Sequence, residues 1–412
     1  MLATIERLTG TPWKQQGPAV LVGLGHGATH WIIATFYVLL PYISETLGLS
    51  YAEAGGLVTL FHAASFTANL GSGAVVDIGG RRVRVLAASL AVGAAALVAV
   101  GFAGSVAWLV APVVLIGLTN NLWHPAAISF LSRRYPDARG FALSIHTLGA
   151  TVGDMLAPLA AGVLLLALSW QGTASLNALP IFVMAAVLVL TLKETKAAPI
   201  GRADGQSSLH AYLQGVGGLV RDRNIIGLCA MAGFRSMTQN GLLVFIPLYL
   251  VGVLEASPLV LGVAVMAMQA GGLFAGPIAG AWSDRAGRQP VVLAGLAATT
   301  LLVAGLTLVE TMVPFIAFVA TLGFALFSVR PVIHSWAMDL AAEDMSGSAV
   351  SVLFGTQSAF TVLVPVAGGL IADVWGLTTV FYILTVSIAV ATAITFFLPD
   401  PRHRHAQERK TQ

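Results

Sequence analysis

The chain has 412 residues, of which 57% are hydrophobic and only 9% are charged, and its formal net charge is +3. Soluble globular domains carry about 25% charged residues, so this composition excludes a soluble enzyme. It also excludes an intrinsically disordered chain, which requires low hydrophobicity and high net charge. The small net charge gives no indication of a nucleic-acid partner. The composition therefore predicts a polytopic membrane protein whose surface contacts the lipid bilayer.

Apolar segments long enough to cross a bilayer recur along the chain, since a transmembrane helix needs about 20 apolar residues. The first 17 residues are polar and lead directly into the first apolar segment, so no signal peptide is expected. Helix is the expected structure throughout, because lipid offers no hydrogen bonds to open strands. The twelve predicted spans are residues 18–44, 53–76, 85–103, 106–132, 140–167, 175–192, 224–252, 259–281, 290–309, 312–338, 347–374 and 377–398.

The longest polar stretch separates these spans into two groups of six. The expected organisation is an N-terminal bundle at 1–192, a cytoplasmic linker at 193–223, a C-terminal bundle at 224–398 and a basic cytoplasmic tail at 399–412. With the N-terminus inside, 19 of the 21 lysine and arginine residues fall on the cytoplasmic side, as the positive-inside rule requires. The prediction is a multi-pass protein of the cytoplasmic (inner) membrane with both termini in the cytoplasm.

Two loop sequences at a half-chain offset indicate that the halves are related. Gly73-Ala-Val-Val-Asp77-Ile78-Gly-Gly80-Arg81 follows the second span, and Gly280-Ala-Trp-Ser-Asp284-Arg285-Ala-Gly287-Arg288 follows the eighth. Similar halves in the same orientation imply a pseudo-twofold axis along the membrane normal. The pattern resembles the signature loop of the major facilitator superfamily, although Ile78 stands where that family usually has a basic residue. The resemblance implies an all-α fold of 12 transmembrane helices in two six-helix bundles, and we expect a monomer.

The same resemblance implies that these loops latch the two halves on the cytoplasmic side. Each aspartate lies where a helix meets the cytoplasm and can pair with arginines or cap a neighbouring helix there. Charge that only sets the membrane topology is the alternative interpretation. The implied gating residues are Asp77, Arg81, Asp284, Arg285 and Arg288.

A further pattern lies in the fifth span, where Gly149-Ala-Thr-Val-Gly153-Asp154-Met-Leu-Ala157-Pro158-Leu-Ala-Ala161-Gly162 resembles an antiporter-type sequence with two glycines replaced by alanine. Its small residues permit close helix packing. In the family this pattern accompanies proton-driven exporters. The sequences Asn120-Asn121-Leu-Trp-His124-Pro125 and Arg139-Gly-Phe-Ala-Leu-Ser-Ile-His146 are similar to those of fosmidomycin-resistance-type exporters.

Ionisable residues inside the spans are few, and each is a candidate site residue because placing it in lipid is costly. The two arginines outside the cytoplasmic segments fall near the bilayer midplane, where transporter substrates bind. Polar residues at helical spacing on neighbouring faces complete the set. The predicted substrate-binding residues are Arg235, Arg330, His26, His30, His62, Asn121, His124, Gln239 and Gln357.

The balance of these charges predicts the sign of the solute. A buried cation needs an anionic partner, and Asp154, the only acid deep in a span, cannot neutralise two arginines. We therefore expect a small anionic solute such as a carboxylate, phosphate or phosphonate, which suits the planar fork of arginine. Histidine titrates near neutral pH, and a buried aspartate can do so, so Asp154 and His124 are the predicted proton carriers. Alternatively, Asp154 pairs with one arginine, and histidines in the spans only join helices.

The predicted function is secondary transport by alternating access, most simply proton-coupled efflux. Proton-coupled uptake of an anionic nutrient such as an organic acid is the alternative on the same fold, and a non-transporting membrane receptor or assembly factor is the alternative of another class. No Walker-type sequence is present, so ATP is not expected to drive transport directly. Enzyme activity is not expected either, because the sequence shows no soluble domain that could host catalysis. No cofactor is expected, and no metal site either, because His26 and His30 lack adjacent carboxylates. The expected partners are the solute, protons and the lipid bilayer, without nucleic acid.

Overall fold

The computed structural model describes residues 12, 15–194, 217–219, 221–309, 311–341 and 346–400. Within these residues every secondary-structure element is a helix, as a bilayer-spanning chain of this composition requires. Most of the predicted linker, and the basic tail from residue 401 onward, lie outside the described residues, so both stay predictions.

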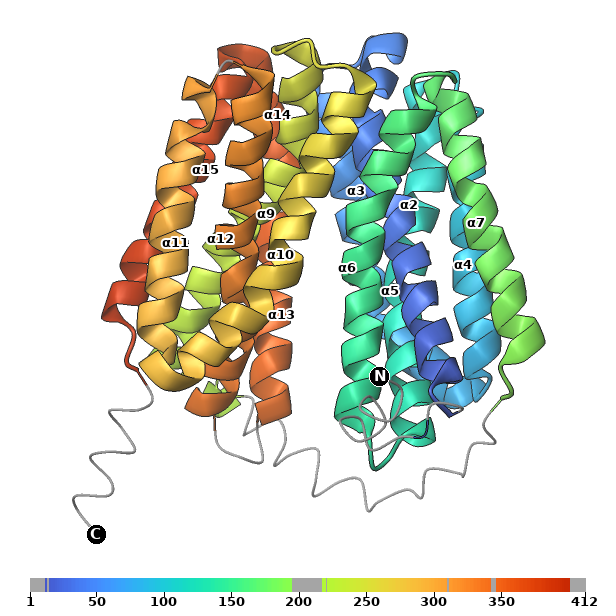
Figure 1. The fold of residues 1–412 in the computed structure, drawn as a ribbon, viewed down its shortest axis with the longest axis vertical. Helices are drawn as coiled ribbons and strands as arrows, with labels where there is room; N and C mark the ends of the chain where they lie inside the picture. Colours follow the sequence, from blue (N-terminus) through green and yellow to red (C-terminus); the bar gives the residue numbers. More distant parts are fainter. Residues whose placement is uncertain are drawn as a thin grey trace. The chain divides into compact units, whose positions relative to one another are not determined.

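The chain divides into two compact units, the first of which comprises Met1–Ala198 and Leu250–Met266. Six long helices of this unit are α2 (Gly17–Leu47), α3 (Tyr51–Gly79), α4 (Arg82–Val100), α5 (Val106–Arg134), α6 (Arg139–Leu164) and α7 (Trp170–Thr191). They run side by side along their long axes (Figure 1). Helix α2 packs most extensively against α6, α3 packs against α5, and α4 packs against both α5 and α7. The unit is therefore a bundle in which α2 and α5 contact several neighbours.

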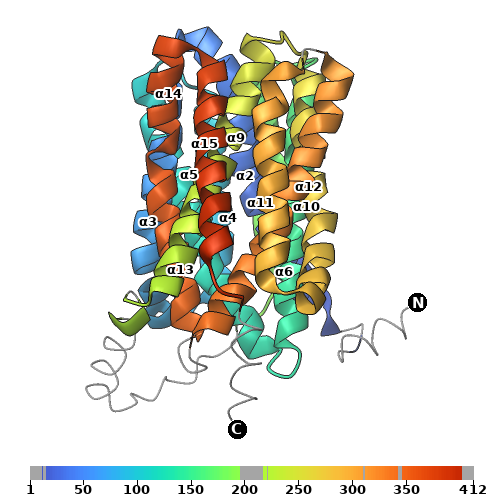
Figure 2. The ribbon, with the colours of Figure 1, turned by 90° about the vertical axis from the view of Figure 1, so that its left-hand side faces the viewer.

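The second unit comprises Pro199–Tyr249 and Ala267–Gln412. Its elements are α9 (Arg223–Gly252), α10 (Pro258–Ala286), α11 (Arg288–Gly305), the short 3-10 helix η2 (Leu306–Leu308), α12 (Met312–Leu340), α13 (Ser346–Val362), α14 (Val364–Trp375) and α15 (Leu377–Phe397). Helix α11 lies beside both α12 and α15 (Figure 2). The core of this unit includes the fully buried side chains of Trp336 and Leu353. The end of α9 and the start of α10 group with the first unit.

The twelve predicted spans correspond to helices whose limits lie within five residues of the predicted ones. Among the described residues, ten helical segments are long and apolar enough to cross a membrane. The two other long helices, α3 and α9, have 29 and 30 residues but are less apolar. They carry predicted site residues, His62 on α3 and Arg235 and Gln239 on α9, which lower their hydropathy. Candidate functional side chains therefore contribute to the polar character of these two helices, together with other polar residues such as Asn69 and Asn240.

The eleventh span differs from its prediction, because it consists of two helices rather than one. Helix α13 ends at Val362, and α14 begins at Val364 after Leu363. Pro365 has no N–H to donate to the carbonyl of Thr361, four residues earlier, and its ring clashes with that carbonyl. Proline in the second position of α14 thus accounts for the break, and it was the signal in the sequence for two helices.

Candidate functional site

Close contact between α2 and α6 positions the candidate residues of the first unit. Gly23 and Gly27 lie one turn apart on α2, and Gly149 and Gly153 lie one turn apart on α6. A methyl group on Gly149 would overlap the carbonyl oxygen of Gly23, and one on Gly153 would overlap that of Gly27. Small residues with this spacing let helix backbones approach closely in membrane proteins. The polar side chains next to these glycines, including Asp154, are therefore held against the opposite helix.

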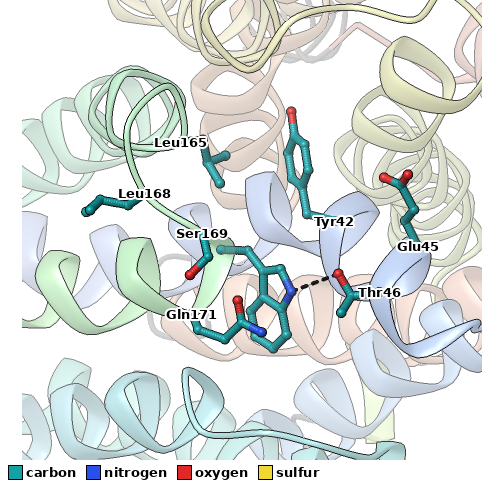
Figure 3. Close-up of a pocket in the computed structure, with 8 residues that line it drawn as sticks. Tyr42, Glu45, Thr46, Leu165, Leu168, Ser169 and Gln171 are labelled. Carbon is teal, nitrogen blue, oxygen red and sulfur yellow. Dashed lines mark hydrogen bonds between the residues drawn. The ribbon is translucent and has the colours of Figure 1, made fainter.

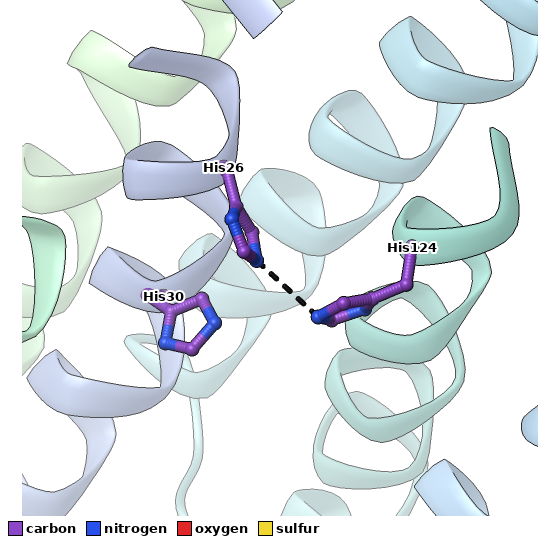
Figure 4. A group of neighbouring side chains, drawn as sticks. All are labelled: His26, His30 and His124. Carbon is purple, nitrogen blue, oxygen red and sulfur yellow. Dashed lines mark hydrogen bonds between the residues drawn. The ribbon is translucent and has the colours of Figure 1, made fainter. Parts of the chain in front are cut away.

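Four histidines from three helices form what we call the histidine cluster: His26 and His30 on α2, His124 on α5 and His146 on α6. The rings of His26 and His146 stack, with centroids 3.7 Å apart and an interplanar angle of 11°. Because a carbonyl oxygen only accepts hydrogen bonds, His26 Nδ1–H donates to the backbone oxygen of His146, at 2.7 Å. On its other side, His26 Nε2 lies 3.2 Å from His124 Nε2, and the three rings that Figure 4 shows converge.

His30 is hydrogen-bonded to Asp154. Its Nδ1 lies 3.0 Å from both carboxylate oxygens of Asp154, and the two side chains are 25% and 27% exposed. The carboxylate accepts, so Nδ1 of His30 carries the hydrogen. The sequence left an arginine open as the partner of Asp154, whereas the structure places a histidine of the same unit beside it. The pair joins α2 to α6, and both of its side chains are partly exposed.

Trp123 sets the orientation of His146. The Trp123 side chain is fully buried on α5, and its Nε1–H donates to His146 Nε2 at 3.2 Å. An indole N–H only donates, so His146 Nε2 carries no hydrogen in this arrangement. Neither residue was among the predicted site residues. The helical spacing of His146 and Asp154 on one face of α6 was the signal for the histidine, while Trp123 had only its sequence neighbour His124 to indicate it.

Two other predicted residues of the first unit make hydrogen bonds between helices. His62 Nε2 on α3 lies 3.4 Å from the hydroxyl of Tyr37 on α2, a long and weak hydrogen bond. Asn121 Nδ2 on α5 donates to the carbonyl of Ser65 on α3 at 2.9 Å. The Ser65 hydroxyl in turn donates to the carbonyl of Gly117 at 3.0 Å. The described contacts of Asn121 thus connect α3 to α5 and are structural, and substrate binding by His62 and Asn121 stays a prediction.

In the second unit, Arg235 is buried in the middle of α9 and is only 3% exposed. Its Nη2 donates to the carbonyl of Leu326 at 2.8 Å, whereas its Nε is buried without a hydrogen-bond partner. Among the described residues no carboxylate forms an ion pair with Arg235. The charge of Arg330 on α12 acts on it and is repulsive. A buried cation in such surroundings is costly unless an anion compensates it.

Arg330 and His334 lie one turn apart on α12 and, together with Arg235, form what we call the arginine site. Both arginine charges act on His334, whose Nε2 is buried without a hydrogen-bond partner. The His334 ring also contacts Phe354 on α13, with centroids 4.9 Å apart. The site therefore brings two arginine charges and a histidine within electrostatic reach of one another. The other predicted residues of this unit are partly exposed: Gln239 on α9 and Gln357 on α13.

The signature loop of the second half forms an ionic network between α10, α11 and α12. Arg288 donates through Nη1 to Asp284 and through Nε to Asp339, the latter at 2.9 Å. Its Nη1 also donates to the hydroxyl of Ser283 at 2.7 Å. Gly287 has a φ of 104°, a conformation that favours glycine, and allows the sharp connection between α10 and α11. Asp339 was not predicted, because it lies 51 residues from Arg288 and no local spacing connects them.

The corresponding loop of the first half is described in part. Asp77 lies near the end of α3, and its side chain is outside the described part of the structure. Arg81 is exposed just before α4, and Arg285 is exposed in the last turn of α10. Arg82, by contrast, is 1% exposed and donates from Nε to the hydroxyl of Ser129 on α5 at 2.7 Å. Gating by the five predicted loop residues stays a prediction.

The first unit also contains two cavities outside the histidine cluster. One, of about 290 Å³, lies where α2 ends and α7 begins, and Trp170 Nε1–H donates there to the hydroxyl of Thr46 at 3.0 Å (Figure 3). Glu45 brings a carboxylate to this cavity. The other, of about 460 Å³, lies along α2, α6 and α7 and is lined mainly by apolar side chains such as Leu24 and Leu148. Neither cavity is lined by a basic residue, whereas the histidine cluster and the arginine site gather the ionisable groups inside the helices and are the candidate functional sites.

Comparison with known proteins relates these features to a family. The sequence profile of the Major Facilitator Superfamily matches residues 22–268 and 228–412. The human protein solute carrier family 2, facilitated glucose transporter member 10, is 34% identical over 119 residues. Those residues are 29% of this chain and span only 22% of the human protein's length.

Two solved structures share the fold over most of the chain. They are crystal structures of a bacterial homologue of the human lysosomal transporter Spinster in inward-facing conformations, one unoccupied and one occupied. Their TM-scores are 0.80 and 0.78 at 16% sequence identity, over 94% of this chain and 97% of the other. This likeness confirms the predicted fold of two six-helix bundles. Since the two profile matches together cover residues 22–412, the protein is a multi-pass membrane transporter and belongs to the major facilitator superfamily.

Proposed function

We propose that this protein is a proton-coupled secondary transporter that exports a small anionic organic solute by alternating access. Membership of the major facilitator superfamily supports solute transport without catalysis. The antiporter-type sequence of α6 and the resemblance to fosmidomycin-resistance-type exporters support proton-driven export. The placement of the basic residues supports a cytoplasmic membrane location with both termini in the cytoplasm.

The anionic character of the solute rests on one observation, the buried guanidinium of Arg235. Its Nε donor lacks a partner, and the described residues offer it no carboxylate. An unsatisfied charged donor costs more than the ~1–3 kcal/mol of a neutral one, so an anion that accepts from Nε and neutralises the charge would be strongly favoured. A carboxylate, phosphate or phosphonate can accept two parallel hydrogen bonds from one guanidinium.

Proton coupling rests on the pair of His30 and Asp154 and on His124 in the same cluster. Both members of the pair can exchange a proton, and they lie 3.0 Å apart and partly open to solvent. Protonation of Asp154 would remove the negative charge that holds His30, and so would alter a contact between α2 and α6. His124 lies one ring away through His26, at 3.2 Å. In this proposal Asp154 and His124 carry the proton, with His30 as the immediate partner of Asp154.

The test of anion binding is thermal unfolding of the purified protein with a panel of small carboxylates, phosphates and phosphonates. A ligand at 100 times its dissociation constant stabilises the folded state by about 2.7 kcal/mol. We expect at least one of these anions to raise the melting temperature, and Arg235→Ala to abolish the shift. Arg223→Ala, an exposed arginine in the first turn of the same helix, is the matched control and should retain the shift.

A conservative variant separates charge from geometry at this position. Arg235→Lys keeps the charge but loses the planar fork, so we expect weaker anion binding than in the unchanged protein and stronger binding than in Arg235→Ala. The direction of transport is measured in proteoliposomes. An imposed proton gradient should drive the anion that raises the melting temperature, and should move it against its own concentration gradient. Anion binding that is the same in Arg235→Ala and Arg330→Ala as in the unchanged protein would remove the anion proposal.

A further inference from the structure

In the histidine cluster, the Nε2 atoms of His26 and His124 face each other, and each is the hydrogen-bond acceptor of its ring. His26 Nδ1–H donates to the carbonyl of His146, and His124 Nδ1–H donates to the carbonyl of Asn120 at 3.0 Å. In a neutral imidazole with hydrogen on Nδ1, Nε2 carries only a lone pair. The Nε2 atoms of His26 and His124 are nevertheless 3.2 Å apart. With these tautomers two lone pairs face each other at this distance, and a cation between them, either a proton or a metal ion, would make the contact favourable.

The third ring meets the same site with the same arrangement. His30 directs its Nδ1–H to Asp154, which leaves Nε2 as its acceptor nitrogen. One ring nitrogen from each of His26, His30 and His124 lies within 4.8 Å of the other two. Each of the three histidines therefore directs one N–H to a backbone carbonyl or a carboxylate and presents the other nitrogen to a common point. This is the arrangement that metal-binding histidines almost always adopt, because the outer hydrogen bond fixes the tautomer and the ring orientation.

The shortest distance between ligand nitrogens fits a small transition-metal ion. Zn–N bonds are about 2.0–2.1 Å long and meet at tetrahedral angles, which places two ligand nitrogens about 3.3 Å apart. The observed 3.2 Å between the Nε2 atoms of His26 and His124 agrees with this value. The third nitrogen has to approach by about 1.5 Å to complete a tetrahedral set. The side chain of His30 is 25% exposed, which gives it room for that movement.

The geometry points to a binding site for one divalent transition-metal ion of the zinc class, held by His26, His30 and His124 in the first unit. Neutral imidazoles favour zinc, copper and nickel over magnesium and calcium, which prefer oxygen ligands. Three protein ligands leave a fourth position for water or for a group of a solute. The carboxylate of Asp154, acting through His30, partly compensates the charge of the ion. This inference concerns the first unit only, and the zinc titration uses neither solute nor proton gradient, so its outcome is distinguishable from that of the proposed function. With the ion bound, His124 would be a ligand and Asp154 alone would remain as the proton carrier.

The test is zinc binding by the purified full-length protein in detergent, measured by isothermal titration calorimetry after treatment with a chelator. The protein carries no polyhistidine tag, and His403→Ala and His405→Ala are introduced in every sample because two tail histidines could bind zinc by themselves. We expect one Zn²⁺ per chain and no binding of Mg²⁺. With Co²⁺ in place of Zn²⁺, we expect the strong visible absorption of a tetrahedral complex.

Matched variants assign the ligands. His26→Gln, His30→Gln and His124→Gln should each weaken zinc binding more than tenfold, whereas His334→Gln, a membrane histidine of the other unit, should leave it unchanged. Asp154→Asn should weaken binding about 10- to 100-fold, as loss of an outer-shell carboxylate does. Size-exclusion chromatography shows which variants remain folded, and His30→Gln changes a side chain that is already partly exposed. The proposal would be overturned if the parent protein did not bind zinc, or if all three ligand variants bound it as the parent does. A proton shared between the rings of His26 and His124 would then explain their contact.

Discussion

The charged side chains inside the helices have different kinds of partner in the two units. Asp154, which the proposed function uses as a proton carrier, has a histidine 3.0 Å away, and both side chains are partly exposed. Arg235 is buried and has one carbonyl as its described hydrogen-bond acceptor, and its charge is permanent. A group that changes its charge and a group that keeps it are suited to different tasks, exchange of protons in the first case and recognition of an anion in the second.

A single substitution tests the proton-carrying role. Asp154→Asn keeps a group that accepts a hydrogen bond from His30 but cannot take up a proton. We expect this variant to lose transport driven by a proton gradient in proteoliposomes while it still binds the anion in thermal unfolding. The same change at Asp137, an exposed residue between α5 and α6, is the control and should leave both measurements unaltered. Proton-driven transport that persists in Asp154→Asn would exclude Asp154 as a carrier.

The candidate site residues could be selected from the sequence because ionisable groups are rare in apolar helices. His26, His30, His124, Asp154 and Arg235 stand out for that reason alone. Their pairing was not predictable, since the partners in the histidine cluster are 98 to 124 residues apart in the chain. Only the packing of α2 on α5 and α6 brings them together.

At the scale of the helices, the glycine contact between α2 and α6 sets the positions of the histidine cluster. The backbones approach so closely at Gly23 and Gly149 that no side chain fits between them. In a bilayer the hydrophobic effect does not drive helices together, so close packing of this kind is a main source of association. The glycine spacing is visible in the sequence of both helices, but the sequence does not state which two helices meet.

Enlarging one of these glycines should therefore destabilise the protein. In Gly149→Ala the added methyl group would overlap the carbonyl oxygen of Gly23 and force the helices apart. Overpacking of this kind costs about 1–3 kcal/mol, which should appear as a lower melting temperature in detergent. The control is Gly140→Ala on the same helix, where nothing lies within 4 Å of the added methyl group. This variant should be neutral or slightly stabilising. Equal melting temperatures of the two variants would contradict the importance of the contact.

Helix limits followed closely from hydropathy, because the apolar thickness of a bilayer fixes the length of a span. The exception was the span that breaks at Leu363, where hydropathy continues across Pro365 but backbone hydrogen bonding does not. Apolar composition reports where lipid can surround the chain, whereas the end of a helix also depends on its backbone hydrogen bonds, which a proline interrupts. Prolines inside other helices, such as Pro41 and Pro158, do not end them, so the sequence alone does not tell which proline marks a break.

At the scale of the whole molecule, the orientation in the membrane is open to a direct test. Gly104 lies between α4 and α5, is exposed, and has space for a side chain, and Asp137 lies between α5 and α6. The native Cys229 is buried and is first replaced by alanine. In intact cells, a membrane-impermeant thiol reagent should label Gly104→Cys, whereas Asp137→Cys should react only after the membrane is opened. The reverse labelling pattern would show that the positive-inside rule gives the wrong orientation for this chain.

The four glycines between α2 and α6 also have a genetic consequence. Every amino-acid replacement that a single nucleotide change can produce from a glycine codon introduces a side chain. No missense substitution at these positions therefore keeps the residue as small as glycine. Because a side chain at Gly149 or Gly153 would meet backbone of the opposite helix, the smallest mutational step available is already a large one. In a library of random single-nucleotide variants selected for transport, these codons should tolerate synonymous changes and little else.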